Sequence, residues 1–129
     1  MRLCATTKLP VFVKGILRPD DAQKSINCGA KGIIVSNHGG RQLDTAVTGI
    51  DALANIIVDG GICRGTDILK AIALGAHAVM VGRPILWGLA VDGQKGVEAV
   101  LEIYRQEFDN AMALCGCTTL SAVSSDLIA

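Results

Sequence analysis

The segment SNHGGRQLD, at residues 36–44, places a histidine and an arginine three positions apart, directly after an apolar run. Histidine titrates near neutral pH and can take a proton from a substrate hydroxyl or α-carbon. Arginine holds a carboxylate through the two parallel donors of its planar guanidinium. We therefore expect His38 to be a catalytic base that also contacts the substrate, and Arg41 to bind the substrate carboxylate. A solvated loop with a structural histidine is the alternative for this pair taken alone.

The chemistry-bearing segment belongs to an internal repeat. VKGILRPDDAQKSINCGAKGIIVSN (13–37) matches VDGGICRGTDILKAIALGAHAVMVGR (58–83). Each copy begins with an apolar run, turns at glycine, enters a helical stretch and closes with Gly-Ala and a second apolar run. Pro19 suits a helix start and Thr66 an N-cap. Gly29 and Gly75 suit helix ends. The repeat predicts strand, helix, strand, twice over.

Four short apolar runs lack the alternation of half-exposed strands, and they lie at residues 11–13, 33–35, 56–58 and 79–81. Such runs are typical of parallel strands covered on both faces. Strands alternating with helices predict an α/β fold with right-handed crossovers. Four strand units are half of an eight-stranded barrel, and a doubly wound sheet is the alternative. Glycines and polar residues follow each run, at the carboxyl rim where α/β barrels hold their active sites.

Residues 96–115 predict one long amphipathic helix that Gly116 ends. Its apolar stripe is expected to pack on the core, and it comprises Val97, Leu101, Tyr104, Phe108 and Met112. His77 is expected away from the site, at the opposite rim. Trp87 is expected in the core, and Cys115 and Cys117 as packing residues near the helix end.

Composition excludes several classes of protein. The chain has 129 residues, half of them hydrophobic and 19% charged, which predicts one packed domain at most. The net charge is zero, so no nucleic-acid or acidic membrane partner is indicated. Five cysteines without a CxxC pair favour a reducing compartment over a disulfide framework, and no metal site is predicted. With no membrane-length apolar run and no signal-peptide core, we expect a soluble intracellular protein.

SNHGGRQLD, preceded by VKGI and followed by VDGGI, RGTDILKAIALGA and VGRP, resembles the FMN-dependent 2-hydroxy-acid oxidase and dehydrogenase family. The resemblance covers nearly the whole chain, including the tail MALCGCTTL. It implies the C-terminal half of a TIM (β/α)8 barrel plus a C-terminal helix, a partial FMN hydroxy acid dehydrogenase domain over residues 1–129. It also implies oxidation of a small 2-hydroxy acid to a 2-oxo acid, with FMN as cofactor and oxygen as electron acceptor.

The resemblance also implies roles for individual residues. His38 would be the base, Arg41 would grip the substrate carboxylate, and Lys14 would lie beside the N1 and O2 edge of the flavin, stabilising negative charge there. Ser36 would contact the same ring. The ribityl chain and phosphate would be held by a segment comprising Asp59, Gly60, Gly61, Ile62, Cys63, Gly82 and Arg83.

Three departures from the family pattern qualify these expectations. The family's N-terminal half does not precede Lys14, the crossover around residues 50–58 is shorter by about ten residues, about two to three helical turns, and Cys63 stands where the family has arginine. A half barrel would leave open edges, so self-association is expected. The alternatives are a non-catalytic fragment that folds or binds only with a partner chain, and another phosphate-binding barrel. The family's eukaryotic members are often peroxisomal, but the C-terminal tripeptide LIA is not of the SKL type.

Overall fold

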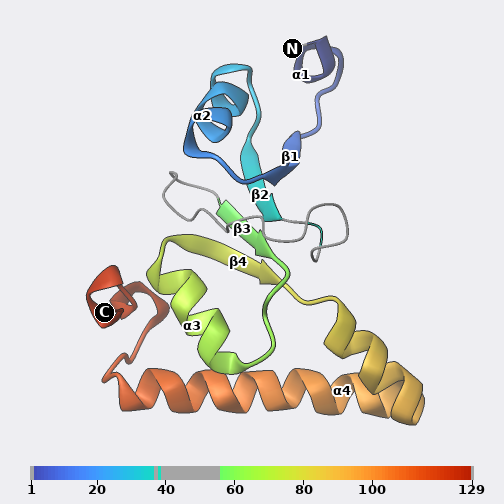
Figure 1. The fold of residues 1–129 in the computed structure, drawn as a ribbon, viewed down its shortest axis with the longest axis vertical. Coiled ribbons are helices and arrows are strands. Elements are labelled where there is room, and N and C mark those ends of the chain that lie inside the picture. The colour runs from blue at the N-terminus through green and yellow to red at the C-terminus, as the bar shows by residue number, and fades with distance from the viewer. Residues whose placement is uncertain (1, 37, 39–55, 129) are drawn as a thin grey trace.

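The computed structural model describes residues 2–36, 38 and 56–128 of the 129 (Figure 1). Helices alternate with strands along most of the described chain. In order the elements are α1 (Arg2–Thr6), β1 (Phe12–Ile16), α2 (Pro19–Asn27), β2 (Gly32–Ser36), β3 (Ile56–Asp59), α3 (Gly65–Ala73), β4 (Ala76–Met80), α4 (Arg83–Leu114), and the 3-10 turns η2 (Leu120–Ala122) and η3 (Ser125–Leu127).

The four strands form one parallel sheet in the order β1-β2-β3-β4. This confirms the α/β fold and the four predicted strands, although β4 begins three residues earlier than expected. Gly75, at φ 98°, ends α3, and β4 starts at the next residue. The helix start at Pro19 and the end at Gly29, at φ 95°, are also confirmed.

One face of the sheet is covered by helices. Ile33, Val35 and Val58 point from the central strands into a core that Ala22 of α2 and Ala71 of α3 complete. Alternation along a strand sends the neighbouring side chains to the opposite face. On that face Phe12 and Met80 remain 45% and 41% exposed. Among the described residues the sheet therefore has one covered face, one largely uncovered face, and open edges at β1 and β4.

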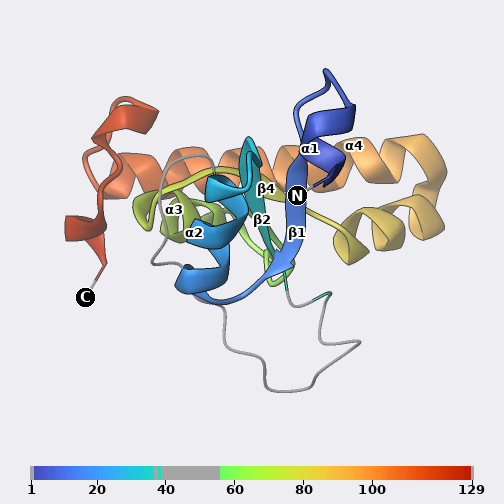
Figure 2. The same ribbon diagram turned by 90° about the horizontal axis from the view of Figure 1, so that it is seen from above.

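The long helix differs from its prediction. α4 begins at Arg83 instead of residue 96, and non-helical backbone at Asp92 and Gly93 divides it into two segments. Figure 2 shows the first segment folded back beside the second, which crosses the full width of the molecule. Gly93 adopts φ 52°, a conformation that glycine accommodates readily, which explains the reversal at this position.

The apolar stripe of α4 is largely confirmed. Tyr104 is buried, and Val97, Phe108 and Met112 are half-buried. The prediction for Leu101 is wrong, because this side chain is 53% exposed. Val100 contacts the core in its place, one position earlier on the helix surface.

Other expectations need correction. Trp87 is 61% exposed, so its assignment to the core is wrong; it lies on the short first segment of α4, where Gly88 is the buried residue. Cys117 is buried as expected, but Cys115 is exposed. Thr66 is not the N-cap of α3, because the helix begins at Gly65. The Asp67 carboxylate accepts hydrogen bonds from the backbone nitrogens of Cys63 and Arg64, the two residues before the helix.

The connection from β2 to β3 contains residues 37–55. Residues 39–55 lie outside the described residues, and with them most of the crossover expected to be short. Ile56–Asp59 nevertheless forms a complete strand, paired with β2 from Ile33↔Ile56 to Ser36↔Asp59. His77 is the second residue of β4 and is exposed.

Candidate functional site

Lys14 is positioned by an irregularity in β1. The register of β1 against β2 shifts between Lys14 and Ile16, and Gly15 between them adopts φ 91°. A bulge of this kind adds one residue to a strand and re-aims the neighbouring side chains. Val13 and Ile16 both contact the helix-covered core as a result. Lys14 lies on the opposite face, with its side chain 41% exposed.

Asp59, the last residue of β3, binds two of the other predicted site residues. Lys14 Nζ lies 2.8 Å from Asp59 Oδ2, and the hydroxyl of Ser36 donates to the same oxygen over 2.7 Å. Ser36 is buried at 3% exposure, so this donor is fixed. Burial raises the pKa of the Asp59 carboxyl, but the hydrogen bonds from Lys14 and Ser36 outweigh it and leave the pKa below its ordinary value. Asp59 is therefore an anion that keeps Lys14 in place.

His38 follows β2 in a left-handed backbone conformation, with φ 59°, which is uncommon outside glycine. Its backbone nitrogen donates to the Ser36 hydroxyl over 3.0 Å, so Ser36 links His38 to Asp59. The histidine also lines a pocket next to Asp59. Strained residues of this type gather at functional sites, where surrounding contacts maintain them. Arg41, the expected carboxylate clamp, lies outside the described residues.

The pocket beside His38 has a volume of about 360 Å³ and is formed by two glycine-containing turns. The first follows β3, where Gly60 and Gly61 both adopt positive φ, at 91° and 76°. The second follows β4 at Gly82, directly before α4. The pocket contains all the residues expected to hold the ribityl chain and phosphate, namely Asp59, Gly60, Gly61, Ile62, Cys63, Gly82 and Arg83.

These residues fit a phosphate group. A Cβ at Gly61 or at Gly82 would meet nothing within 4 Å, so open space lies beside the backbone of both turns. Arg83 supplies a cation at the first position of α4, and a helix N-terminus favours an anion. The Cys63 thiol is exposed on the wall of the pocket, at the position where the family pattern has a second cation.

Arg64 does not supply that cation. Its guanidinium donates to Oε1 of Glu107 on α4, at 3.3 Å from Nε and 3.0 Å from one terminal nitrogen. The hydrogen bonds to Arg64 and to the backbone of Gly65 hold the pKa of Glu107 below its ordinary value. Of the two arginines near the glycine turns, Arg83 is the one that lines the pocket.

Sequence reasoning missed part of the site. Met80, Pro84 and Trp87 also line the pocket. The VGRP segment is expected to form a phosphate-type turn. Its proline is the sequence signal that could have identified a helix start beside the same pocket.

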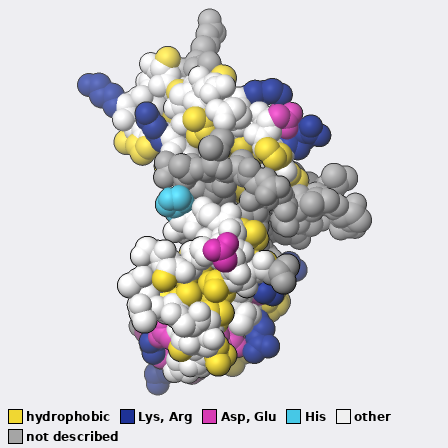
Figure 3. Space-filling model, turned by 90° about the vertical axis from the view of Figure 1, so that its left-hand side faces the viewer, with side chains coloured by type: hydrophobic (Ala, Val, Ile, Leu, Met, Phe, Trp, Pro, Cys, Tyr) yellow, Lys and Arg dark blue, Asp and Glu magenta, His cyan; other side chains and the backbone are white. Residues whose placement is uncertain are grey.

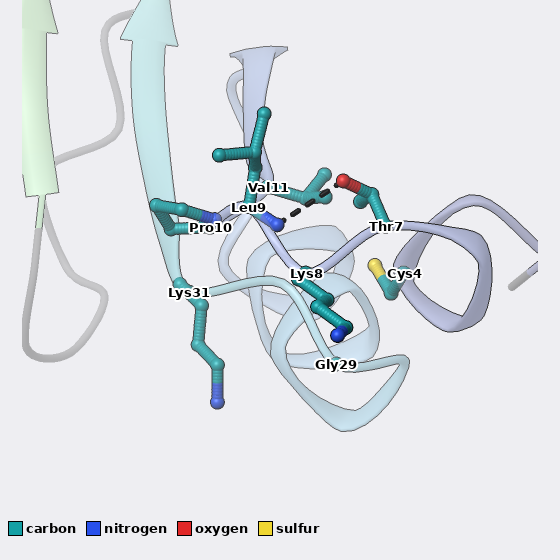
Figure 4. Close-up of a pocket in the computed structure, with 8 residues that line it drawn as sticks. All are labelled: Cys4, Thr7, Lys8, Leu9, Pro10, Val11, Gly29 and Lys31. Carbon is teal, nitrogen blue, oxygen red and sulfur yellow. Dashed lines mark hydrogen bonds between the residues drawn. The ribbon is translucent and has the colours of Figure 1, made fainter.

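A second pocket, of about 230 Å³, lies at the other end of the sheet (Figure 4). Val11 and Lys31, which precede β1 and β2, line it together with Cys4 and Gly29. Thr7 accepts a hydrogen bond from the Leu9 nitrogen within it. Because active sites of parallel α/β folds lie at the carboxyl ends of the strands, this pocket is not the candidate site. No group of three or more possible metal ligands occurs in the described part of the chain.

The profile of the FMN-dependent dehydrogenase family matches residues 1–129. Among curated proteins, L-lactate oxidase of Nostoc sp. is 50% identical over 136 aligned residues, which cover 98% of this chain and 37% of the relative. Human 2-hydroxyacid oxidase 1 is 52% identical over 132 residues, covering 95% of this chain and 36% of the relative. The chain thus spans little more than a third of the length of these relatives.

The alignment lengths also indicate that some residues of the relatives have no counterpart in this chain. The alignment with the Nostoc protein has 136 positions but contains 98% of 129 residues, or about 126, so about ten positions of the relative have no counterpart here.

Solved structures show the same relationship. Mandelate oxidase with 3,3-difluoro-2-hydroxy-3-phenylpropionic acid matches with a TM-score of 0.85 and 50% identity, over 94% of this chain and 40% of that one. Mandelate oxidase with benzoyl-formic acid matches with a TM-score of 0.84 and 51% identity, over 92% of this chain and 38% of that one. The parallel sheet and its helices therefore have a TIM-barrel-like α/β arrangement. The family profile matches the whole chain and relatives about 50% identical match nearly all of it, so this chain belongs to the FMN-dependent dehydrogenase family.

Proposed function

We propose that residues 1–129 form a partial FMN hydroxy acid dehydrogenase domain, the C-terminal half of a (β/α)8 barrel plus its last helix. Four consecutive parallel strands, with their helices on one face, support this reading. The activity of the completed barrel is the FMN-dependent oxidation of a small 2-hydroxy acid to a 2-oxo acid. Relatives named for lactate, 2-hydroxy acids and 4-hydroxymandelate support that substrate class.

One observation carries the proposal: a charged cluster adjoins a phosphate-type pocket at the carboxyl ends of neighbouring strands. Lys14, Ser36 and Asp59 come from three adjacent strands, and one carboxylate oxygen joins them. His38 belongs to both the cluster and the pocket. A base, a cation and an anion-binding turn are the parts that flavin oxidation of a hydroxy acid requires.

The residues divide into three roles. His38 takes a proton from the hydroxyl or α-carbon of the substrate, and Arg41 binds its carboxylate. FMN, when bound, supplies the two-electron acceptor. Lys14 provides positive charge toward the N1 and O2 edge of the flavin, and Ser36 contacts the same ring. The phosphate and ribityl chain are held by the pocket residues from Asp59 to Cys63, with Gly82 and Arg83.

Oxygen is the proposed final electron acceptor, because the relatives named above are oxidases. All five cysteines are free thiols, which supports an intracellular, reducing location. None of the helices in the described part of the chain is both long and apolar enough to cross a membrane. Neither nucleic acid nor membrane is proposed as a partner.

The chain alone is proposed to be inactive and to self-associate. In the part of the chain that the structure describes, the sheet has open edges and a largely uncovered face that the other half of a barrel would close. Figure 3 shows further hydrophobic side chains grouped on the lower part of one side of the molecule, where the C-terminal segment lies in Figure 1. A non-catalytic fragment that folds or binds only with a partner chain is the second candidate, and the same uncovered face supports it.

Complementation with an N-terminal half, followed by measurement of bound flavin, separates these two candidates. The chain would be purified alone and after co-expression with the N-terminal part of human 2-hydroxyacid oxidase 1. We expect the completed assembly to retain FMN absorbance and to lose it anaerobically on addition of glycolate, lactate or a longer 2-hydroxy acid. The chain alone should show no such bleaching. An assembly that forms without retaining flavin supports the non-catalytic candidate, and bleaching by the 129-residue chain alone contradicts the requirement for a second half.

A further inference from the structure

The turn after β3, residues Gly60–Arg64, is held from outside by the second segment of α4. The Tyr104 hydroxyl donates to the carbonyl oxygen of Ile62 over 2.9 Å, in a buried hydrogen bond between residues 42 positions apart. Tyr104 is 6% exposed, so no bulk solvent competes for this contact. The Ile62 carbonyl belongs to the same turn whose other side lines the phosphate-type pocket.

Glu107, one helical turn along, holds the end of this turn. Its Oε2 accepts from the backbone nitrogen of Gly65 over 2.8 Å, while its Oε1 accepts from the Arg64 guanidinium. The two backbones are in contact here, because a Cβ at Gly65 would collide with the backbone nitrogen of Phe108. Thus α4 binds the turn at Ile62 and at Arg64, on either side of Cys63, and it also binds Gly65, the first residue of α3.

The first segment of α4 forms the opposite wall of the pocket. Arg83, Pro84 and Trp87 line it. This segment is fixed to the second one by close backbone contact, because a Cβ at Gly96 would collide with the carbonyl oxygen of Gly88. One helix therefore contributes a pocket wall with its first segment and supports the facing turn with its second.

We propose that Tyr104 and Glu107 are positioning residues that fix the turn Gly60–Arg64 against the Arg83 wall, so that α4 sets the width of the phosphate pocket. The inference rests on the proposed function, in which this pocket takes the FMN phosphate. Neither side chain lines the pocket in the described structure, so both act through the backbone of the turn.

The physical effect is a change in the population of turn conformations. Removal of the Tyr104 hydroxyl leaves the buried Ile62 carbonyl without this donor, which destabilises the closed arrangement of the turn. When the competent conformation is populated less, the apparent affinity for a ligand falls by the same fraction. The turn should open more often while the strands and the body of α4 remain folded.

The test uses the completed assembly, in which this chain is co-expressed with the N-terminal part of human 2-hydroxyacid oxidase 1. It compares the original chain with its Tyr104→Phe and Glu107→Gln variants, using Glu102→Gln as the matched control. Glu102 lies on the same helix but accepts from Arg105 and Gln106, away from the turn. Hydrogen exchange of the amides at 61–65 is measured by mass spectrometry, and FMN and inorganic phosphate affinities by titration. Tyr104→Phe is expected to speed exchange at 61–65 and to raise the FMN dissociation constant by about three- to tenfold. Exchange in β1 and β2 should stay unchanged, and Glu102→Gln should match the original chain.

Three outcomes separate the inference from the proposed function. Unchanged exchange at 61–65 in both variants overturns the inference, whether or not FMN binds. Faster exchange with unchanged affinity also overturns it, because a purely structural role would give that result. Failure of the assembly with the original chain to bind FMN or phosphate counts against the proposed pocket, and the exchange data then decide whether Tyr104 and Glu107 position the turn. If Tyr104→Phe lowers the unfolding midpoint of the whole protein, the exchange at 61–65 and the FMN affinity of the Glu107→Gln variant provide a separate test.

Discussion

The ammonium of Lys14 lies 2.8 Å from Oδ2 of Asp59, although the two residues come from strands that do not neighbour each other in the sheet. Ser36, on the strand between them, donates to the same oxygen. The carboxylate therefore joins β1, β2 and β3 at their carboxyl ends. This relationship couples the proposed flavin-side cation to the stability of the fold.

Replacement of Asp59 by asparagine should lower the free energy of unfolding by about 1–2 kcal/mol. The substitution removes the counter-charge of Lys14, but the lysine is 41% exposed, so solvent compensates for part of the loss. Urea denaturation measures the change. Asp109→Asn is the matched control, because Asp109 pairs with Arg105 at a more exposed place on α4. We expect less than about 0.5 kcal/mol there, and equal effects at the two positions would contradict the special role of Asp59.

The stability difference between the original chain and Asp59→Asn should depend on pH in the acid range. The pKa of Asp59 in the fold lies below the unfolded reference of 3.8. A lowered carboxyl pKa stabilises the fold fully above the unfolded pKa, and this stabilisation is lost as the pH falls through the folded pKa. The difference should therefore be constant from neutral pH to about pH 5 and shrink below about pH 4. If the stability difference between the original chain and Asp59→Asn persists unchanged to about pH 2, the charge of Asp59 does not stabilise its contact with Lys14.

Cys63→Arg should lower the FMN dissociation constant of the completed assembly by about ten- to a hundredfold, since a charge-assisted contact contributes about 1.5–3 kcal/mol. The structure sharpens this expectation, because Arg64 is bound to Glu107 and cannot substitute at the pocket. Cys28→Arg, at an exposed position after α2, controls for added charge. Fluorescence titration with FMN measures the dissociation constants of the original assembly and of both variants. Looser binding, or an equal gain at position 28, would place the phosphate elsewhere.

Much of the fold could be predicted from the sequence because it is encoded in local patterns. Apolar runs marked all four strands, and Gly29 and Gly75 marked the ends of α2 and α3. The start of α4 was missed because its first segment is short and mostly exposed, so residues 85–91 suggested a core run. The choice between barrel and doubly wound sheet depended on family resemblance, since four parallel strands fit both.

The residues of the site could be predicted from the sequence, but the hydrogen bonds and the ion pair that connect them could not. The resemblance named Lys14, Ser36, His38 and Asp59, yet nothing in the sequence indicated that one oxygen of Asp59 would bind two of them. The bond from Tyr104 to Ile62 was equally hidden, because tyrosine on an amphipathic stripe predicts packing, and the partner of its hydroxyl depends on how two distant elements meet.

Catalysis in a completed assembly should depend on His38 and Arg41. His38→Ala should abolish anaerobic flavin bleaching, because no other base has been assigned to the substrate. Arg41→Lys should mainly raise KM, since lysine cannot reproduce the bidentate contact with a carboxylate. His77→Ala, on the exposed part of β4, is the matched control and should leave turnover unchanged. Undiminished turnover in His38→Ala would overturn the assignment of the base.

The isolated chain should self-associate through the uncovered face of its sheet. Phe12 and Met80 lie on this face at the two edge strands, 45% and 41% exposed, and among the described residues no further strand pairs with these edges. Substitution of both by serine removes apolar area from the face without changing net charge, so association should weaken by about tenfold or more. Leu114→Ser is the control, because Leu114 is 89% exposed at the far end of α4. Size-exclusion chromatography with light scattering over a micromolar concentration series gives the masses. A sharp monomer for the original chain would refute the prediction, and equal weakening by Leu114→Ser would place the contact outside the sheet.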